Sequence, residues 1–293
     1  MSPLTPHAAW LLWLLTVPVV VPVPPLDSDH VRTLDVARGR LPVDSSRLTS
    51  TQPPPKAETS GREFFASWGY NGDSYTNSDI HFSQPSLGND FTLLNVRIRD
   101  SKGWTDGLFA HSLTVPQYNF RFGIFFNDKW GVEVAHDHIK WIVREDQTVR
   151  RTGTLNGAPV DGDVALTADV LRYQLNNGAN PLFFNLIRRW RLTGEPGRTG
   201  HLVFLAKAGA GFPNPHTENT VFGIPNDKGF QFVQGWNVDA AAAVRLRLWK
   251  PLYFEFEEKL LYASYHGIKI DRGTAKNNVK ASEFSFSFGV SFR

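Results

Sequence analysis

The last eleven residues of the chain read "EFSFSFGVSFR" (residues 283–293), and their alternation decides the fold. Every second position carries an apolar side chain: Phe284, Phe286, Phe288, Val290 and Phe292. The positions between them are small or polar: Glu283, Ser285, Ser287, Gly289 and Ser291. Side chains along a strand point alternately to its two faces, so the pattern predicts a β-strand with one apolar and one polar face. An apolar face made almost entirely of phenylalanine indicates that this face meets hydrocarbon.

Seven further segments between residues 62 and 282 show the same period of two. They are "FFASWGYN" (64–71), "YNFRFGIFFN" (118–127), "WGVEVAHDH" (130–138), "LFFNLIRRW" (182–190), "LVFLAKAGAGF" (202–212), "WNVDAAAAVRLRL" (236–248) and "LYFEFEEKLLY" (252–262). Their connections alternate strictly between short ("NDK", "TGEPGRTG", "KP") and long. Short periplasmic turns and long extracellular loops are typical of outer-membrane barrels. The sequence therefore predicts an all-β fold, an eight-stranded antiparallel transmembrane β-barrel located in the cell outer membrane.

Two positions complicate this prediction. The segment "DFTLLNVRIRD" (90–100) also alternates. We place it above the membrane, as a β-excursion of the first long loop, because nine spanning strands would leave the termini on opposite sides. Glu258 lies on the lipid-facing parity, where a charge is costly near mid-membrane. We expect a bulge or an interfacial position to accommodate it.

The composition excludes several classes of protein. The chain has no cysteine, which rules out disulfides, thiolate metal sites and a lipid-anchored cysteine. The net charge is only +3, and Lys and Arg form no basic stripe, so no nucleic-acid partner is expected. Aromatic residues make up 13% of the chain, which suits a barrel in lipid.

The N-terminal region differs from the rest. Residues 1–25 contain an apolar run broken by Pro18 and Pro22, and we expect an export signal or an atypical signal-like segment. An uncleaved membrane anchor or a misassigned start are the alternatives. Residues 26–61 are polar and proline-rich and are expected to form a disordered linker. The barrel is expected over residues 62–293.

The inward parity of the predicted strands carries charges of both signs. They are Arg121, Glu133, Asp137, Arg189, Lys207, Asp239, Arg245, Glu255, Glu257 and Lys259. Unpaired buried charges are costly, so these side chains are expected to pair across the lumen and to plug it. This favours a structural role for them over a small channel.

Four histidine-containing clusters follow strands that run outward, so all four are expected at one rim. They are "DIHFS" (79–83), "AHDHIK" (135–140), "GFPNPHTE" (211–218) and "SYHG" (264–267). His81 and Ser83 share a strand face, as a nucleophile and its base would, and outer-membrane lipid A deacylases use such a pair. His136 and His138, with Asp137 and Glu218, offer imidazole and carboxylate ligands for iron or zinc. A metal ion at the rim therefore stays open, with its identity unknown; the cofactor is otherwise unknown, and no cofactor-binding residue is named.

The order of several motifs resembles the lipid A oxidase-like outer-membrane proteins. The matching pieces are "PQYNFRFGIFFNDKWGVEVAHDHIK" (116–140), "RRW" (188–190), "AGAGFPNPHTE" (208–218), "FEEK" (256–259) and the aromatic terminus. The resemblance covers roughly residues 62–293 and implies an eight-stranded barrel associated with oxygen-dependent oxidation of the proximal glucosamine of lipid A. The long first loop departs from the simpler members of that family.

If the protein is an enzyme, the predicted site residues are His138, Lys140, His216, Glu257 and Lys259, holding the sugar-phosphate end of lipid A. Cationic side chains among them would pair with phosphate. The alternatives are a non-catalytic structural, adhesive or lipopolysaccharide-binding barrel, a lipid A deacylase, and a small channel. Expected partners are outer-membrane lipid, lipopolysaccharide and, through the C-terminal aromatic strand, the barrel-assembly machinery.

Overall fold

The computed structural model describes residues 61–107, 110–113, 116–175, 178–194 and 200–293. The expectations for residues 1–25 and almost all of 26–61 concern segments outside these residues. The described part holds seventeen strands: β1 (Glu63–Tyr75), β2 (Ser78–Gln84), β3 (Asn89–Val96), β4 (Ile98–Arg99), β5 (Tyr118–Phe125), β6 (Trp130–His138), β7 (Trp141–Val143), β8 (Gln147–Leu155), β9 (Ala158–Leu166), β10 (Leu171–Leu175), β11 (Pro181–Thr193), β12 (Leu202–Pro213), β13 (His216–Val221), β14 (Ile224–Phe230), β15 (Gly235–Arg247), β16 (Leu252–Ile270) and β17 (Gly273–Phe292). Two short 3-10 helices accompany them, η3 (Pro85–Leu87) and η4 (Trp104–Asp106). Among these residues, no helix is long and apolar enough to cross a membrane.

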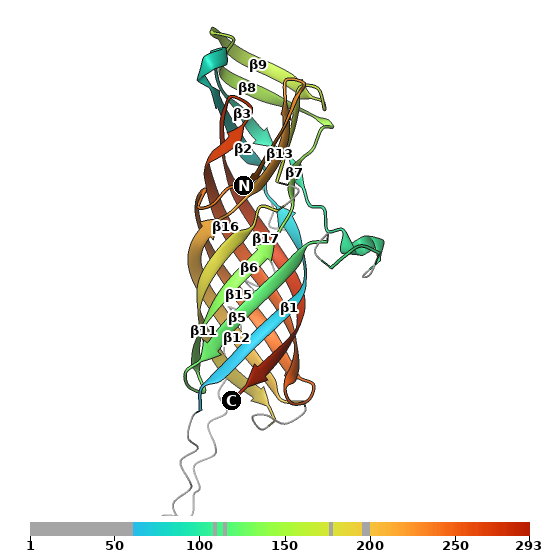
Figure 1. Ribbon diagram of the computed structural model, residues 1–293, viewed down its shortest axis with the longest axis vertical. Helices are drawn as coiled ribbons and strands as arrows, with labels where there is room; N and C mark the ends of the chain where they lie inside the picture. Colours follow the sequence, from blue (N-terminus) through green and yellow to red (C-terminus); the bar gives the residue numbers. More distant parts are fainter. Residues whose placement is uncertain (1–60, 108–109, 114–115, 176–177, 195–199) are drawn as a thin grey trace, which may run out of the picture.

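The pairings form a closed ring, and the predicted all-β fold is confirmed. The ring runs β1–β5–β6–β11–β12–β15–β16–β17 and returns from β17 to β1, with every pair antiparallel. The first and last strands pair from Phe64 opposite Phe292 to Tyr75 opposite Ala281. Figure 1 shows the resulting tilted barrel with the C-terminus at its lower end. Closure lets the wall's backbone N–H and C=O groups bond to each other, as a span through lipid requires.

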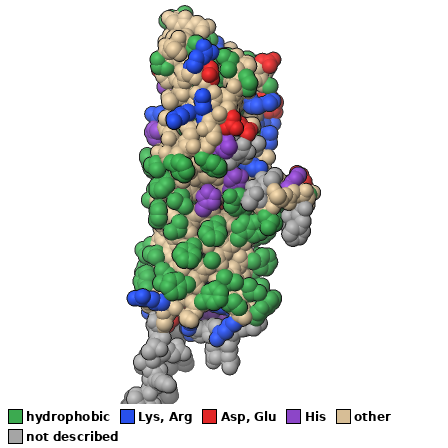
Figure 2. Space-filling model, in the orientation of Figure 1, with side chains coloured by type: hydrophobic (Ala, Val, Ile, Leu, Met, Phe, Trp, Pro, Cys, Tyr) green, Lys and Arg blue, Asp and Glu red, His purple; other side chains and the backbone are tan. Residues whose placement is uncertain are grey.

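The two faces of the wall follow the alternation of the sequence. In β17, Phe288 and Phe292 are 61% and 56% exposed, whereas Ser287 and Ser291 between them are 4% and 6% exposed. The same contrast holds around the wall, where the outward apolar side chains include Phe64, Phe120, Phe122, Phe126, Trp130, Val132, Val134, Phe184, Leu186, Trp190, Trp236, Val238, Phe256 and Leu260. We call this surface the apolar belt; Figure 2 shows it covering the lower body, with charged groups above and below. A closed barrel with such a belt is the architecture of outer-membrane β-barrel proteins.

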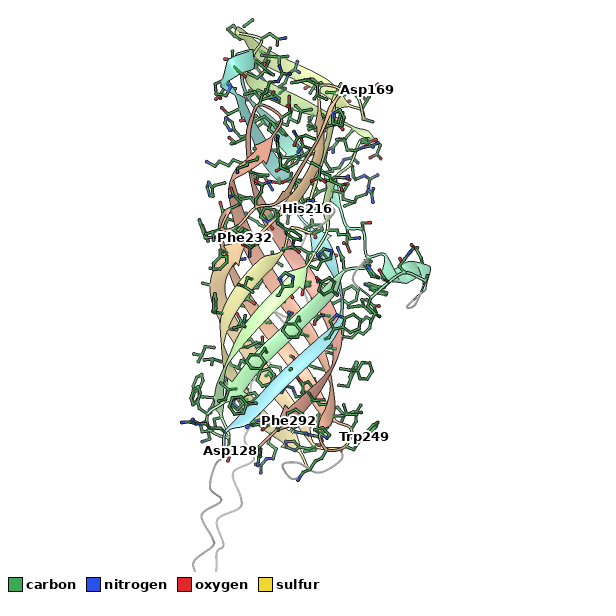
Figure 3. The ribbon with its side chains drawn as sticks, viewed as in Figure 1. Asp128, Asp169, His216, Phe232, Trp249 and Phe292 are labelled. Atoms are coloured by element: carbon green, nitrogen blue, oxygen red, sulfur yellow. The ribbon has the colours of Figure 1, made fainter. Side chains whose placement is uncertain are left out.

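The connections sort to two ends of the barrel as expected. The turns between β5 and β6, between β11 and β12, and between β15 and β16 lie at the lower end, near Asp128 and Trp249 (Figure 3). The long connections all lie at the upper end (Figure 1). By the usual sidedness of such barrels, the lower end is periplasmic and the upper end extracellular.

The long loops build a folded body above the barrel, which we call the head. The strands β2, β3, β8 and β9 extend the main sheet from the upper end of β17, so that this sheet has 12 strands. A second, 5-stranded sheet has the order β14-β13-β10-β7-β4. Buried apolar side chains, among them Trp141, Tyr173 and Tyr265, form one core in the head. The predicted excursion of residues 90–100 is confirmed as β3 and β4 of the head.

Of the two expectations for Glu258, a bulge or an interfacial position, the register of the strands tests the bulge. The register of β16 with β15 and β17 is unbroken at this residue, and the irregularity lies between Tyr265 and Ile268 instead. The expectation of a bulge at Glu258 was therefore wrong. The Ser282 hydroxyl donates a hydrogen bond to the Glu258 carboxylate, which gives the charge a polar partner on the wall.

Candidate functional site

The barrel interior is filled by a network of buried ion pairs. Lys207 Nζ lies 3.1 Å from Glu133, 2.8 Å from Glu255 and 2.6 Å from Glu257. Arg121 joins the network 3.0 Å from Glu257. This confirms the predicted cross-lumen pairing, and the paired side chains occupy the interior of the barrel.

Two of the five predicted site residues belong to this network. Glu257 and Lys259 are buried, and Lys259 pairs with Asp137 and lies 3.5 Å from Glu257. In the sheet they stand opposite Ala243 and Ala241, at the level of the apolar belt. The structure therefore brings these two residues together inside the barrel and separates them from the other three.

The other three predicted residues lie at the upper rim, just above the belt. His138 Nδ1 is 2.9 Å from Asn180 Oδ1, and its ring stacks on Tyr118 with centroids 4.8 Å apart. His216 begins β13, its Nε2 lying 2.9 Å from Asp227 Oδ1; Figure 3 shows it where the barrel meets the head. Burial lowers the pKa of Lys140, which follows β6, and the nearby Asp100 acts in the opposite direction. Together with the neighbouring His136, these three residues form what we call the histidine rim: His136, His138, Lys140 and His216.

The register explains why the rim lies at this height. Along the same parity of β6, Val132 and Val134 are exposed to the surroundings, His136 is partly buried, and His138 is buried. On β5, Phe120 stands opposite His136, and Tyr118 opposite His138. On this parity of β6, the side chain thus changes from valine at Val134 to imidazole at His136. In a membrane this change marks the boundary between hydrocarbon and headgroups.

The segment around η4, which begins at Lys102 and which we call the arm, lies beside the β1–β17 closure. It projects sideways from the top of the barrel (Figure 1). Trp104 contacts Phe284 and Phe286 edge-on, at centroid distances of 6.1 and 5.6 Å. Lys102 Nζ lies 4.9 Å from the Phe284 ring. The arm therefore places an aromatic ring and a cation at the upper edge of the belt.

The sequence-predicted pair His81 and Ser83 does not have the geometry of a nucleophile and its base. His81 Nε2 lies 3.0 Å from Asp90 Oδ1, and Ser83 Oγ donates to Asp90 Oδ2 over 3.3 Å. The carboxylate thus stands between the two side chains, and all three lie in the head. In a catalytic triad the histidine would occupy the central place.

A second serine–histidine pair was missed. Ser264 Oγ lies 2.7 Å from His266 Nε2, and Ser264 Oγ also lies 2.7 Å from Asn278 Oδ1. Both residues are on β16 above Tyr262, next to the exposed Trp236 that pairs with Ser264. The signal was present in "SYHG", since residues two apart share a strand face, but only the histidine was singled out.

The rim metal that the sequence left open has no matching donor set among the described residues. Glu218, proposed with the histidines, accepts a hydrogen bond of 3.4 Å from Gln174 instead. Among the described residues, no group of three or more His, Asp and Glu side chains is arranged to hold a metal ion. We therefore derive no metal-dependent step from these residues.

Comparisons with known proteins give similarity to solved outer-membrane structures. No protein-family model and no curated protein match the sequence. The outer membrane protein OprG from Pseudomonas aeruginosa is 14% identical, with a TM-score of 0.38, over 80% of this chain and 97% of that one. Ail, the attachment invasion locus protein of Yersinia pestis, is 13% identical, with a TM-score of 0.33, over 78% and 98%. Neisserial surface protein A is 10% identical, with a TM-score of 0.34, over 80% and 98%. At such values the likeness fixes no function, and the closed ring and apolar belt of this chain are what make it an outer-membrane β-barrel protein.

Proposed function

We propose that the protein binds the sugar-phosphate headgroup of outer-leaflet lipopolysaccharide at its histidine rim. The observation that carries the proposal is the position of this rim, directly above the apolar belt. A lipid whose acyl chains lie along Val132 and Val134 would have its headgroup at the level of His136 and His138. Imidazole and ammonium groups at that level supply hydrogen bonds and charge for phosphates and sugar hydroxyls.

The arm, which contacts Phe284 and Phe286 on the outward face of β17, supports the same proposal. Trp104 and Lys102 combine an aromatic ring and a cation at the upper edge of the belt. Aromatic rings settle at the membrane interface, and lysine reaches from there to phosphate. Of the five predicted site residues, His138, Lys140 and His216 belong to this proposal. Glu257 and Lys259 do not, because they are buried among the ion pairs of the barrel interior.

Binding is tested with purified full-length protein in detergent and purified lipopolysaccharide. The variant His138→Ala/His216→Ala should bind at least about tenfold more weakly, which corresponds to about 1.4 kcal/mol. The matched control is His81→Ala, which removes a histidine from the head. Equal affinity of all three proteins would contradict the proposal.

A second candidate, ester hydrolysis, is supported by the Ser264–His266 pair. With Nε2 of His266 unprotonated, the Ser264 hydroxyl would pass its proton to that nitrogen as Oγ attacks an acyl ester carbonyl of the bound lipid. The ester C–O bond would then break, the alcohol would leave with the proton, and water would release the acyl group. The aromatic side chains Trp236 and Tyr262 beside the pair support a position near the membrane interface, where such esters lie.

Mass spectrometry of lipid A from cells with and without the protein separates these candidates. A lost acyl chain that requires Ser264 but survives Ser83→Ala supports hydrolysis. A gain of one oxygen supports the oxidase-like activity that the sequence resemblance implies. An unchanged spectrum rejects both activities and leaves the binding proposal intact.

A further inference from the structure

The periplasmic end of the barrel holds a cavity of about 340 Å³ with a strong excess of positive charge. Among the described residues, seven Lys and Arg side chains line it, against the two carboxylates Glu63 and Asp128. One of the seven, Arg245, is already matched by Glu255 at 2.5 Å. Six of the described cations therefore face two described carboxylates, a formal excess of four.

The inner part of the cavity is organised around one buried carboxylate. Glu63 is only 4% exposed, and three guanidinium groups share it: Arg189 at 2.8 Å, Arg247 at 3.3 Å and Arg293 at 3.6 Å. A carboxylate carries one negative charge, so it cannot neutralise three guanidinium groups. Their remaining donors point to a second anion, since the strongest bonds of a guanidinium group are those to carboxylate or phosphate.

The outer part of the cavity reaches the membrane side of the wall. Arg188 and Trp190 line it from the outward face of β11, while Arg189 and Arg245 line it from within. The Arg188 guanidinium lies between two tryptophan rings, 4.9 Å from Trp130 and 5.3 Å from Trp190. Both rings are exposed at the lower edge of the belt, where headgroups of the periplasmic leaflet lie.

Two of the cations have no acidic partner among the described residues. Within the described part of the chain, no carboxylate lies within ion-pair distance of Arg188 or Arg191. An arginine held between indole rings keeps its charge and its in-plane donors while its faces are covered. Arg188 is therefore preorganised to receive an anion that approaches along the wall.

We propose that this cavity is a binding site for a phosphate group at the periplasmic rim. Two sources share that chemistry, the headgroup of an anionic phospholipid of the periplasmic leaflet and free phosphate. The opening past Arg188 and Trp190 suits the headgroup, whose acyl chains would continue along the apolar belt. The cluster of arginines inside suits either source.

The test uses the full chain in detergent at low salt, with two probes. Inorganic phosphate is titrated by calorimetry, and phosphatidylglycerol retention is measured by native mass spectrometry. The variant Arg188→Gln/Arg191→Gln keeps the ion pairs of Glu63 and should weaken binding about tenfold. The control is Arg150→Gln, an exposed arginine of the head that pairs with Asp161.

A second variant, Glu63→Gln, should change the affinity for phosphate in the opposite direction. Glu63→Gln removes the negative charge that competes for the arginines, so a folded sample should bind phosphate more tightly than wild type. Folding of each variant is checked by the difference in gel mobility between boiled and unboiled samples. Binding of either probe with these responses supports the site and identifies its source. If neither probe binds wild type, or if Arg188→Gln/Arg191→Gln binds as wild type does, the proposal is overturned.

Discussion

Replacing Lys207 by methionine should destabilise the barrel strongly, because the change leaves three carboxylates around an apolar side chain. Glu133, Glu255 and Glu257 all lie within 3.1 Å of the Lys207 ammonium, and this lysine is fully buried. Removing one partner of a buried ion pair typically costs about 3–5 kcal/mol.

The surrounding cations reduce this cost but do not cancel it. Arg245 lies 2.5 Å from Glu255, and Arg121 lies 3.0 Å from Glu257, so these two carboxylates keep a partner. Glu133 keeps only Arg121 at 4.0 Å and a hydrogen bond of 3.3 Å from Asn185. We therefore expect Lys207→Met to lower the free energy of unfolding by roughly 3 kcal/mol, near the lower end of that range.

The measurement is urea-induced unfolding in lipid vesicles, followed by tryptophan fluorescence and gel mobility. Arg150→Met is the matched control, since its ion pair with Asp161 is exposed and screened by water, so its loss should leave the free energy of unfolding nearly unchanged. Adding Glu133→Gln to Lys207→Met should restore part of the loss, because the least compensated carboxylate is then neutral. A loss below about 1 kcal/mol for Lys207→Met would refute the view that this ammonium neutralises the network.

Three other predictions concern the belt, the arm and the head. Phe122→Arg at the middle of β5 should cost about 2–4 kcal/mol in vesicles, whereas Phe126→Arg at the lower rim should cost about 0–1 kcal/mol, although both phenylalanines are exposed. Equal unfolding midpoints for these two variants would contradict the assignment of Phe122 to the hydrocarbon and of Phe126 to its lower edge. Trp104→Ala removes two edge-to-face contacts, so limited proteolysis should cut the arm faster while the barrel keeps its gel mobility; unchanged cleavage would mean that these contacts do not hold the arm. Arg144 forms a bidentate ion pair with Asp146, which lowers the pKa of Asp146 to about 2. The stabilisation by this pair is therefore present above the ordinary pKa of 3.8 and is lost as the pH falls from 3.8 to about 2. An NMR titration should find this low pKa in wild type and a value near 3.8 in Arg144→Gln, and an ordinary pKa in wild type would exclude the pair in solution.

The wall of the barrel could be predicted because its chemistry repeats every two residues. Apolar side chains on one parity alternate with mostly small, polar or charged ones on the other, and the parity alone placed Arg121, Lys207 and Glu255 in the lumen. The pattern holds because one environment, hydrocarbon, covers a whole face of the sheet.

The head lacks such a uniform environment, and most of its strands were not predicted. In β9 the sequence "APVDGDVAL" lies in the outermost strand of its sheet, and most of its residues are exposed. The upper half of β16, "ASYHGIKI", breaks the apolar alternation because it leaves the lipid and enters the head. Pairings such as β17 with β2 and β3 with β8 join distant segments, and no local pattern specifies them.

The candidate site was predicted in part for the same reason. Sequence order placed His138 and His216 correctly at the ends of spanning strands. It did not show how far along β16 the belt extends, so Glu257 and Lys259 were grouped with rim residues although they lie inside the wall. The Ser264–His266 contact depends on the same upper part of β16, which continues as a strand after Tyr262.

The length of β16 and β17 has a mechanical consequence. These hairpin strands have 19 and 20 residues, and about 3.4 Å per residue gives them a reach of roughly 65 Å. The hydrocarbon band of such a barrel is about 25 Å tall, and a strand tilted by about 40° uses roughly 33 Å of its length to cross it, so about half of this ladder lies outside the hydrocarbon. The same two strands that form part of the wall thus carry the head, with one irregularity in their pairing, between Tyr265 and Ile268. A ligand bound at the top of the head would be held well above the bilayer surface.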